Sequence, residues 1–333
     1  MKNIIKLNSG FICYGNAVGV KESEGPLGEY FDMHDTDDRF GKDTWEKAES
    51  EMQRLAFNVA LNKGQLKFED IGAIFAGDLL NQCVGSSYGL LGCNIPYFGI
   101  YGACSTSAEG IILASVFTSK DIFKKCAVVT SSHNCSAERQ YRTPIEYGGQ
   151  RTPTSQWTVT GSGAFIIGDS EHGNVRITEA VPGRVIDKGV NDPNNMGAAM
   201  APAVADTLVR YFTESGKKPS DFDLILTGDL GYEGSSILHE LMSAEGFPDI
   251  ENHNDCGILI YNREKQDTHA GGSGCGCAAT VLSAYILPHM EKGVYKDVLF
   301  IATGAMMSPD SVKQGNSIPS IAHLLHFSVN KEC

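Results

Sequence analysis

A cysteine among small residues is the strongest chemical signal in this sequence. Cys104 lies in the run Gly102-Ala103-Cys104-Ser105-Thr106-Ser107, between the apolar segment 95–100 and a long apolar stretch of helical character that begins near Ala108. Small residues let a strand turn sharply into a helix, and the N–H groups and positive dipole end of that helix then point at the sulfur. Such placement can lower the pKa of a thiol or hold an anion. The motif therefore predicts a functional pocket at Cys104.

The other cysteines are predicted to be ordinary core residues. The chain has 10 cysteines, and a free cysteine is often buried as a small hydrophobe. Their irregular spacing does not indicate a disulfide framework, and the pair Cys275-Gly276-Cys277 is spaced too closely for a zinc site. We expect no metal and no cofactor. The cysteines that lie in or beside apolar stretches are Cys13, Cys83, Cys93, Cys126, Cys135 and Cys256.

Charge and length exclude several classes of function. The 333 residues carry 40 acidic and 27 basic side chains, a formal net charge of −13. This charge argues against nucleic acid or an anionic lipid surface as the main partner. No segment approaches the roughly 18 uninterrupted apolar residues of a membrane-spanning helix, and residues 1–6 do not begin a long apolar region. We therefore expect no signal peptide and no transmembrane segment.

The chain contains an internal repeat. The segment 70–79 ends in Gly77-Asp78-Leu79 and recurs as the segment 221–230, which ends in Gly228-Asp229-Leu230. An amphipathic helical pattern precedes each copy. A second correspondence then follows in both halves, consisting of a small-residue turn, an apolar helix, a break and an apolar strand. This order of elements predicts an α/β fold with layered helices and sheets, in which two halves are related by a pseudo-twofold axis.

The predicted halves cover residues 1–172, which include Cys104, and residues 173–333. Ligands usually bind at the carboxyl ends of parallel strands, so we expect Cys104 to face the loops that follow such strands, at the junction between the halves. Helices are predicted at 44–61, 201–212 and 278–290. Four apolar runs are typical of buried strands in mainly parallel sheets covered by helices, namely 71–76, 127–130, 224–227 and 298–302.

These features resemble the thiolase superfamily, whose members have two similar halves and a nucleophilic cysteine at the start of a buried helix. Cys104 matches that cysteine, and His269 with the glycine-rich run after it matches the active-site histidine. Two departures stand out. Gly228, with Asp229 beside it, stands where thiolases have an active-site asparagine, and the strand 300–307 lacks the second, acid-base cysteine of degradative thiolases. The resemblance implies the thiolase-like fold without ordinary thiolase chemistry.

Seven runs resemble more closely one branch of this superfamily, found in spore-forming bacteria. Its members bind dipicolinic acid, a pyridine with two carboxylates, and help to load it into the developing spore through a membrane channel assembly. The resemblance implies a non-catalytic homodimer that binds dipicolinic acid or calcium dipicolinate and contacts membrane channel proteins from the cytoplasmic side. The runs are Gly77 to Gln82, Gly102 to Ser107, Ser131 to Asn134, Ala137 to Arg142, Glu146 to Gln150, Thr158 to Gly163 and Ala302 to Ala305.

A planar dianion needs fixed donors and positive charge, which a chain of net charge −13 must supply in one place. The segment 131–157 carries three arginines and no aspartate, together with neutral donors that include Tyr141 and Gln156. These arginines can instead pair with the glutamates of the same segment, Glu138 and Glu146, or with a partner subunit, and the polar pair after Leu80 can cap a turn. The predicted ligand-binding residues are Asn81, Gln82, Cys104, His133, Arg139, Arg142, Asp229 and His269.

Two other functions stay open. An acyltransferase similar to a ketoacyl synthase would use Cys104 as its thioester nucleophile and His269 as its base. It would need a tunnel for the acyl chain and a site for a phosphopantetheine arm. A purely structural partner of a membrane complex would keep an empty pocket. The incomplete catalytic set favours the non-catalytic, ligand-binding interpretation.

Overall fold

The computed structural model describes residues 3–141, 151–248 and 250–329. A ten-stranded sheet runs through them in the order β3-β2-β4-β6-β1-β7-β12-β11-β8-β9, and β5 pairs separately with β10. The first half supplies β1 (Ile5–Val18), β2 (Ala73–Gly77), β3 (Tyr97–Gly99), β4 (Cys126–Ser132), β5 (Trp157–Thr158) and β6 (Gly161–Asp169). The second half supplies β7 (Val175–Val181), β8 (Leu224–Thr227), β9 (His253–Asp255), β10 (Gly272–Ser273), β11 (Asp297–Ala305) and β12 (Ser320–Val329).

The order of strands in the sheet reflects the internal repeat of the sequence. Reading outward from the antiparallel pair of β1 and β7, one half is β1-β6-β4-β2-β3 and the other is β7-β12-β11-β8-β9. Strands with the same place in the repeat therefore occupy equivalent places in the sheet, as the sequence predicts. The chain passes from one half to the other between Asp169 and Val175.

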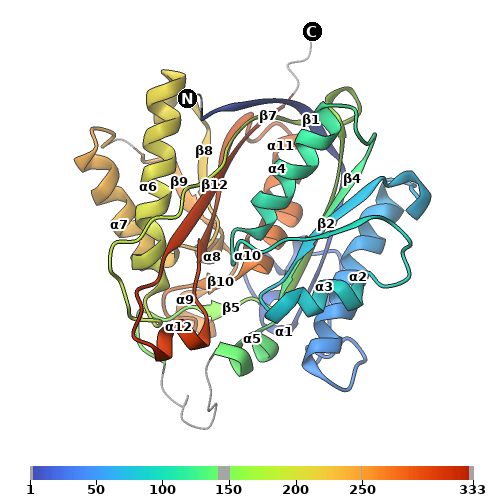
Figure 1. Cartoon of the computed structure of the whole chain (residues 1–333), viewed down its shortest axis with the longest axis horizontal. Coiled ribbons are helices and arrows are strands. Elements are labelled where there is room, and N and C mark those ends of the chain that lie inside the picture. Colours follow the sequence, from blue (N-terminus) through green and yellow to red (C-terminus); the bar gives the residue numbers. More distant parts are fainter. Residues whose placement is uncertain (1–2, 142–150, 249, 330–333) are drawn as a thin grey trace.

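Helices cover both outer faces of the bent sheet and fill the space inside it (Figure 1). On the outside, α2 packs on β1 and β6, and α6 packs on β12 and β11. Between the two halves of the sheet, α4 contacts β4 and β11, and α10 contacts β6. The helices are α1 (Val20–Ser23), α2 (Trp45–Lys63), α3 (Val84–Gly89), α4 (Thr106–Ser119), α5 (Asn134–Tyr141), α6 (Met196–Ser215), α7 (Gly231–Ala244), α8 (Cys256–Leu259), α9 (Arg263–Gln266), α10 (Cys275–Val281), α11 (Leu287–Glu291) and α12 (Pro309–Lys313).

The predicted helices form where a capping side chain stands directly before a run of apolar residues at helical spacing. The Thr44 side chain caps α2 by accepting from the Lys47 N–H, and the helix buries a stripe that includes Met52 and Ala56 at four-residue spacing. Asn195 caps α6 in the same way. A π-helical turn, Leu282–Ile286, joins α10 to α11. The helices predicted at 44–61, 201–212 and 278–290 are thus confirmed.

The sheet is mixed, so the expectation of mainly parallel sheets is wrong. β2 runs parallel to β3 and β4, and β8 runs parallel to β9 and β11. The central strands β6, β1, β7 and β12 pair antiparallel with their neighbours. A strand covered by helices on both faces has a continuous apolar run whichever way it points, because burial and not direction sets that pattern.

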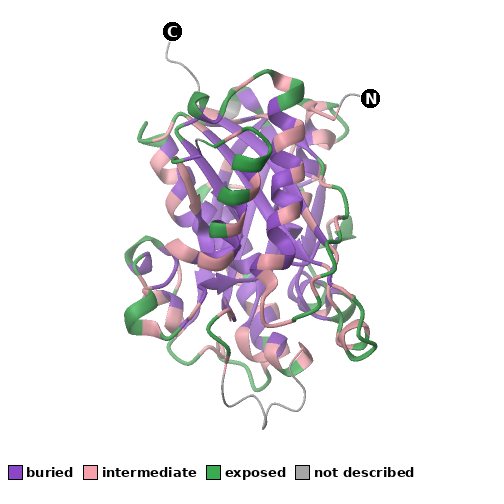
Figure 2. Ribbon diagram, turned by 90° about the vertical axis from the view of Figure 1, so that its left-hand side faces the viewer, coloured by how far each residue is buried: buried purple, intermediate pink, exposed green. Residues whose placement is uncertain are grey.

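The buried interior consists of the sheet and the two central helices, while exposed residues gather on the outer helices and loops (Figure 2). Of the cysteines predicted to be core residues, Cys135 is half-buried and the others are buried. None of the helices in the described ranges combines the length and hydropathy that crossing a bilayer requires.

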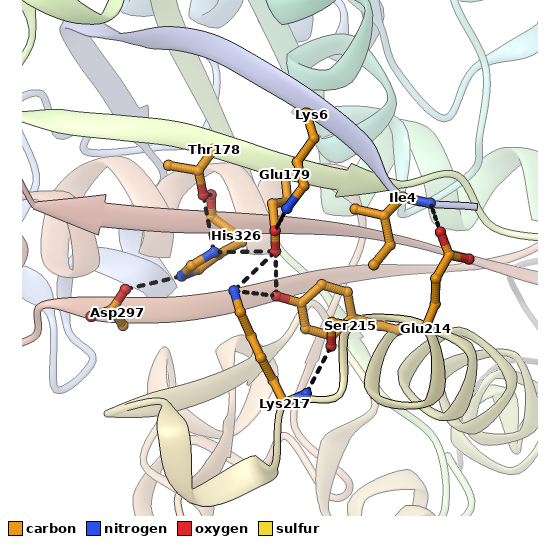
Figure 3. Close-up of polar contacts among 10 residues, drawn as sticks. Ile4, Lys6, Thr178, Glu179, Glu214, Ser215, Lys217, Asp297 and His326 are labelled. Atoms are coloured by element: carbon orange, nitrogen blue, oxygen red, sulfur yellow. Dashed lines mark hydrogen bonds and ion pairs between the residues drawn. The ribbon is translucent and has the colours of Figure 1, made fainter. Parts of the chain in front are cut away.

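A charged cluster ties the sheet to α6 (Figure 3). Glu179 of β7 accepts hydrogen bonds from Lys6, from Lys217 and, over 2.6 Å, from the Tyr211 hydroxyl. His326 of β12 lies 3.5 Å from the same carboxylate. These contacts hold the pKa of Glu179 well below its ordinary value. The cluster is a structural anchor between the N-terminal strand, the sheet and the end of α6.

Candidate functional site

The turn before α4 determines where Cys104 lies. Ala103 has a φ of 50°, a left-handed conformation that L residues seldom adopt. Hydroxyl side chains hold this turn: Thr106 donates to the Ala103 carbonyl over 2.6 Å, and Ser105 donates to the Gly102 carbonyl over 2.6 Å. The small and hydroxyl residues that flank Cys104 in the sequence are therefore those that a tight turn into a helix requires.

Cys104 lies in the wall of a cavity of about 130 Å³ built by both halves of the chain. Among the described residues of this wall, Glu138 is the one with a formal charge, and the others are apolar or neutral and polar. Near the lower end of the molecule in Figure 1, α5, α12 and β5 lie close together around this region. The wall is formed by Leu79, Tyr101, Ala103, Cys104, Ala137, Glu138, Tyr141, Gln156, Thr158, Pro193, Asn194, Met196, Ser273, Ala305, Met307, Ser308, Pro309 and Val312.

Asp229 lies behind Cys104 and is buried. Its carboxylate accepts hydrogen bonds from the Thr303 hydroxyl and, over 2.9 Å, from the Gly274 N–H. Burial raises the pKa of Asp229 to about 6, although these donors act in the opposite direction. The sequence predicted both Cys104 and Asp229 as site residues, and in the structure the Asp229 charge lies near enough to act on the Cys104 thiol.

The environment of Cys104 opposes formation of a thiolate. Burial, followed by the negative charge of Asp229, raises the pKa of the Cys104 thiol well above its ordinary value. The helix start contributes a dipole effect of only about 0.3–1 kcal/mol, which burial next to a carboxylate outweighs. Of the two alternatives that the sequence left open here, this environment disfavours the thiolate, and Cys104 is a neutral thiol.

Two tyrosines form one side of the cavity. The Tyr141 hydroxyl donates to the Leu79 carbonyl over 2.9 Å, and it lies 3.0 Å from the Tyr101 hydroxyl. Because Tyr141 uses its proton on Leu79, Tyr101 is the donor in this pair. On another side, the Gln156 amide donates to the carbonyls of Asp229 and Gly272, at 2.6 and 3.0 Å. These contacts fix polar side chains around a pocket that has aromatic walls.

Asn81 and Gln82 lie beside this cavity and not in its wall. They line an adjoining cavity of about 400 Å³, which shares Tyr101 and Tyr141 with the first. The Asn81 N–H donates to the Gln140 side chain over 3.0 Å, and Gln82 has a φ of 57°. Both belong to a tight turn between β2 and α3, so the turn interpretation and the ligand interpretation both stay open for them.

Of the arginines in the segment 131–157, Arg139 and Arg151 do not line the cavity. Arg139, on α5, pairs with Glu46 of α2, and it lines a separate outer cavity together with Asn81. Arg151 pairs with Asp267 at 3.0 Å. Arg142 lies outside the described residues. This Arg139 contact is thus with a glutamate of another element, whereas the alternative expected a glutamate of the segment 131–157.

The two predicted histidines lie away from the cavity wall. His133 is buried, and its Nε2 donates to the Asp38 carbonyl over 2.7 Å while its Nδ1 accepts from the Cys135 N–H. Burial lowers its pKa. The His269 ring lies 2.7 Å from the Thr152 carbonyl and 3.0 Å from Asp267. In the ranges that the structure describes, no cluster of three or more His, Cys, Asp or Glu side chains could hold a metal ion.

Sequence reasoning missed much of the cavity wall. It noted Tyr141 and Gln156 as neutral donors without selecting them, and it did not consider Tyr101, although this residue directly precedes the Cys104 motif. The contributions of Asn194 and of α12 come from loops distant in sequence, and no motif marks them. Tertiary folding alone brings these residues to Cys104.

Comparison with known proteins gives a consistent picture. The family model described as stage V sporulation protein AD matches residues 3–328. Stage V sporulation protein AD of Bacillus subtilis (strain 168) is 44% identical over 313 residues, which are 94% of this chain and 92% of that protein.

Solved structures of thiolase-like synthases share the fold. The 3-oxoacyl-[acyl-carrier-protein] synthase III from Aquifex aeolicus VF5 has a TM-score of 0.57 and 15% identity, with 96% of this chain and 99% of that chain covered. A variant of Xanthomonas campestris OleA bound with cerulenin has a TM-score of 0.61 and 14% identity, with 96% of both chains covered. The expected thiolase-like fold is confirmed.

Proposed function

The chain belongs to the stage V sporulation protein AD family, and we propose that it binds dipicolinic acid in the cavity at Cys104 without changing it chemically. The observation that carries this proposal is that Cys104, in the wall of a small pocket, is buried near the charge of Asp229, which keeps the cysteine a neutral thiol. A single aromatic ring with two carboxylates would find aromatic walls and fixed donors there. In this function the chain carries the ligand, or its calcium chelate, to a channel that loads the developing spore.

The donors of the wall suit carboxylate oxygens. A hydroxyl group comes from Ser273, an amide comes from Asn194, and a thiol comes from Cys104. Tyr101 and Tyr141 supply the flat surfaces on which a pyridine ring would pack.

The same contacts argue against acyl transfer. A thioester nucleophile needs an activated sulfur and a base within reach, but Cys104 faces a carboxylate and His269 contacts Thr152 and Asp267. The likeness to solved synthases is a likeness of fold, and function has to be argued from the site.

An uncharged segment supports a homodimer. No charged residue lies between Asp78 and Glu109, and this stretch contains the edge strand β3 and several exposed apolar side chains, among them Leu91, which is 76% exposed. Two copies of net charge −13 repel each other least through an uncharged face. An open strand edge can also pair with its own copy across a twofold axis. We propose that the second copy binds here and that membrane contact comes through channel proteins.

The direct test is isothermal titration of the purified protein with dipicolinate, with and without calcium, and separately with acetyl-coenzyme A. We expect saturable dipicolinate binding and no response to the thioester. A matched titration with benzoate, a single ring with one carboxylate, shows whether both carboxylates matter. Thioester binding with release of free thiol, and no heat with dipicolinate, would overturn the proposal and restore Cys104 as a nucleophile.

A further inference from the structure

Two histidines meet at the outer edge of the second half, and neither belongs to the wall of the cavity at Cys104. His239 lies on α7 and is exposed, while His253 lies on the edge strand β9 and is half-buried. The His239 Nε2 is 3.2 Å from the His253 Nδ1. We propose that this pair is a binding site for a divalent transition-metal ion of the zinc type, which imidazole ligands suit. The inference does not depend on the proposed ligand of the cavity.

A chain of hydrogen bonds behind His253 determines which of its ring nitrogens carries the proton. The Thr227 hydroxyl donates to the Asp255 carboxylate over 2.6 Å, so the Thr227 oxygen accepts from the His253 Nε2, which lies 2.9 Å away. A neutral imidazole has a single N–H, and burial lowers the pKa of His253 to about 3, which keeps the ring neutral. Nδ1 of His253 therefore presents a lone pair to His239.

This support behind His253 is what metal-binding histidines have. A ligating histidine donates its other ring N–H to an acceptor, which fixes its tautomer and the orientation of the ring. Thr227 is that acceptor here, and Asp255 orients Thr227 in turn. Asp255 is buried, and its two carboxylate oxygens also accept from the backbone N–H groups of Leu230, Gly231 and Ile258. The backbone thus holds the lone pair of His253 in place before any ion binds.

The spacing of the two nitrogens fits a single ion. With Zn–N distances of 2.0–2.1 Å, two ligands of a tetrahedral zinc ion have their nitrogens about 3.3 Å apart, and the separation here is 3.2 Å. The rings are inclined by 66°, so they meet edge to face and do not stack. The exposed His239 can rotate slightly and move its proton from Nε2 to Nδ1 through solvent. Each ring then offers one lone pair, and the pair as a whole loses no proton.

The site has room for further ligands. In the part of the chain that the structure describes, no third His, Cys, Asp or Glu side chain completes a metal-binding group with these two. A four-coordinate zinc ion would keep water at its remaining positions, as open zinc sites do. We therefore expect reversible binding, weaker than at a closed site with four protein ligands, that a chelator removes without unfolding the protein.

The test is titration of the chelator-treated full chain with Zn²⁺ in competition with a chromophoric zinc indicator. The wild type should bind one more zinc ion than His239→Gln and His253→Gln, and His34→Gln, at another exposed histidine, should equal the wild type. This difference excludes zinc held by any of the 10 cysteines, which all the variants keep. Equal stoichiometry in the wild type and His239→Gln would overturn the proposal, and this exposed position keeps the test valid if His253→Gln fails to fold.

A second pair of variants tests the support from Thr227. Thr227→Val removes the acceptor of the His253 Nε2 proton at nearly constant shape, so zinc affinity should fall about 10- to 100-fold. Thr207→Val makes the same change at another buried threonine, whose hydroxyl donates to the Ala322 carbonyl over 2.9 Å, and it should leave zinc affinity unchanged. Equal affinities in the wild type and Thr227→Val would overturn the role of Thr227.

Co²⁺ in place of zinc identifies the ligand atoms. The absorption difference between the wild type and His239→Gln should contain the weak visible bands of cobalt bound by nitrogen and oxygen, without an intense thiolate charge-transfer band. A thiolate band in that difference would assign the ion to a cysteine and overturn the histidine site.

Discussion

Cys104 and Cys275 lie in one small buried cluster although they come from opposite halves of the chain. Each stands at the start of a central helix, Cys104 before α4 and Cys275 at the first residue of α10. The Cys275 thiol donates to the Ser131 carbonyl over 2.8 Å, whereas the Cys104 thiol lies near the negative charge of Asp229. Two cysteines near the starts of corresponding helices thus have different surroundings, and of the two only Cys104 belongs to the cavity wall.

The Cys104 thiol should react slowly with alkylating reagents. Burial and Asp229 raise its pKa, and alkylation needs the thiolate, so we expect its rate with iodoacetamide at pH 8 to be more than about tenfold below that of free cysteine. In Asp229→Asn the neighbouring charge is gone and the rate should rise. Mass spectrometry of the Cys104 peptide measures both rates, with the half-buried Cys135 as internal reference. Rapid labelling of Cys104 in the wild type would contradict a neutral Cys104 thiol.

Tyr141→Phe should weaken dipicolinate binding. The change removes the donor to the Leu79 carbonyl and the acceptor of the Tyr101 hydroxyl, so the aromatic side of the cavity loses its fixed geometry. The loss of about 0.5–1.5 kcal/mol for one hydrogen bond corresponds to about a 2- to 12-fold rise in Kd. Calorimetry measures it, and Tyr88→Phe, at an exposed tyrosine outside the cavity wall, is the control. Equal losses in both variants would show that the effect does not arise in the cavity.

The sequence predicted the architecture better than the chemistry of the site. The recurrence of Gly77-Asp78-Leu79 as Gly228-Asp229-Leu230 predicted two equivalent halves. Two segments with the same apolar pattern form the same elements and bury the same faces, and the strand order of the sheet has that symmetry. Strand direction could not be read from the sequence. The strands β6 and β12, which pair antiparallel, are mostly buried, as are β4 and β11, which also run parallel to β2 and β8. The sequence left a thiolate and a bound anion as alternatives at Cys104, because it shows the helix that follows Cys104 but not the carboxylate that folding brings near it.

Stability should fall as pH rises because of Glu49. This side chain is buried, it accepts from Ser131 and Ser136, and burial together with the nearby Asp78 raises its pKa to about 8. A raised acid pKa means that the folded state binds more protons than the unfolded state between about pH 4.5 and 8, so the free energy of unfolding decreases as pH rises through that range.

Urea denaturation of the wild type and Glu49→Gln at pH 5 and pH 9 tests this dependence. The variant cannot ionise at this position, so its stability should fall less between the two pH values than that of the wild type. Both serine hydroxyls can reorient to suit the amide, which keeps the variant a fair comparison. An equal fall in the two proteins would assign the pH dependence to other groups.

Glu179→Gln should destabilise the fold without affecting the cavity at Cys104. The change removes the charge that Lys6, Lys217 and His326 surround (Figure 3). We expect a loss of about 1–3 kcal/mol in the free energy of unfolding. Because the pKa of Glu179 is lowered, its contribution is present above about pH 4.5 and disappears as pH falls below that value. Chemical denaturation at pH 7 and pH 3 measures it, and Glu214→Gln, an exposed carboxylate at the end of α6, should change stability little. Similar losses in both variants at pH 7 would contradict the anchor role.

Phe98→Asp should separate the proposed dimer. Phe98 lies on the edge strand β3 and is 43% exposed, and the change places a charge on each copy where two uncharged edges would meet. Like charges that face each other across a strand pair are destabilising, and here they add to the net charge of −13 on each chain. Light scattering coupled to size-exclusion chromatography should therefore give a dimer for the wild type and a monomer for the variant. Val294→Asp makes the same kind of change at a residue of the second half that is 57% exposed, and it should leave the dimer intact. A wild-type monomer, or a dimer that survives Phe98→Asp, would show that β3 is not the surface on which the second copy binds.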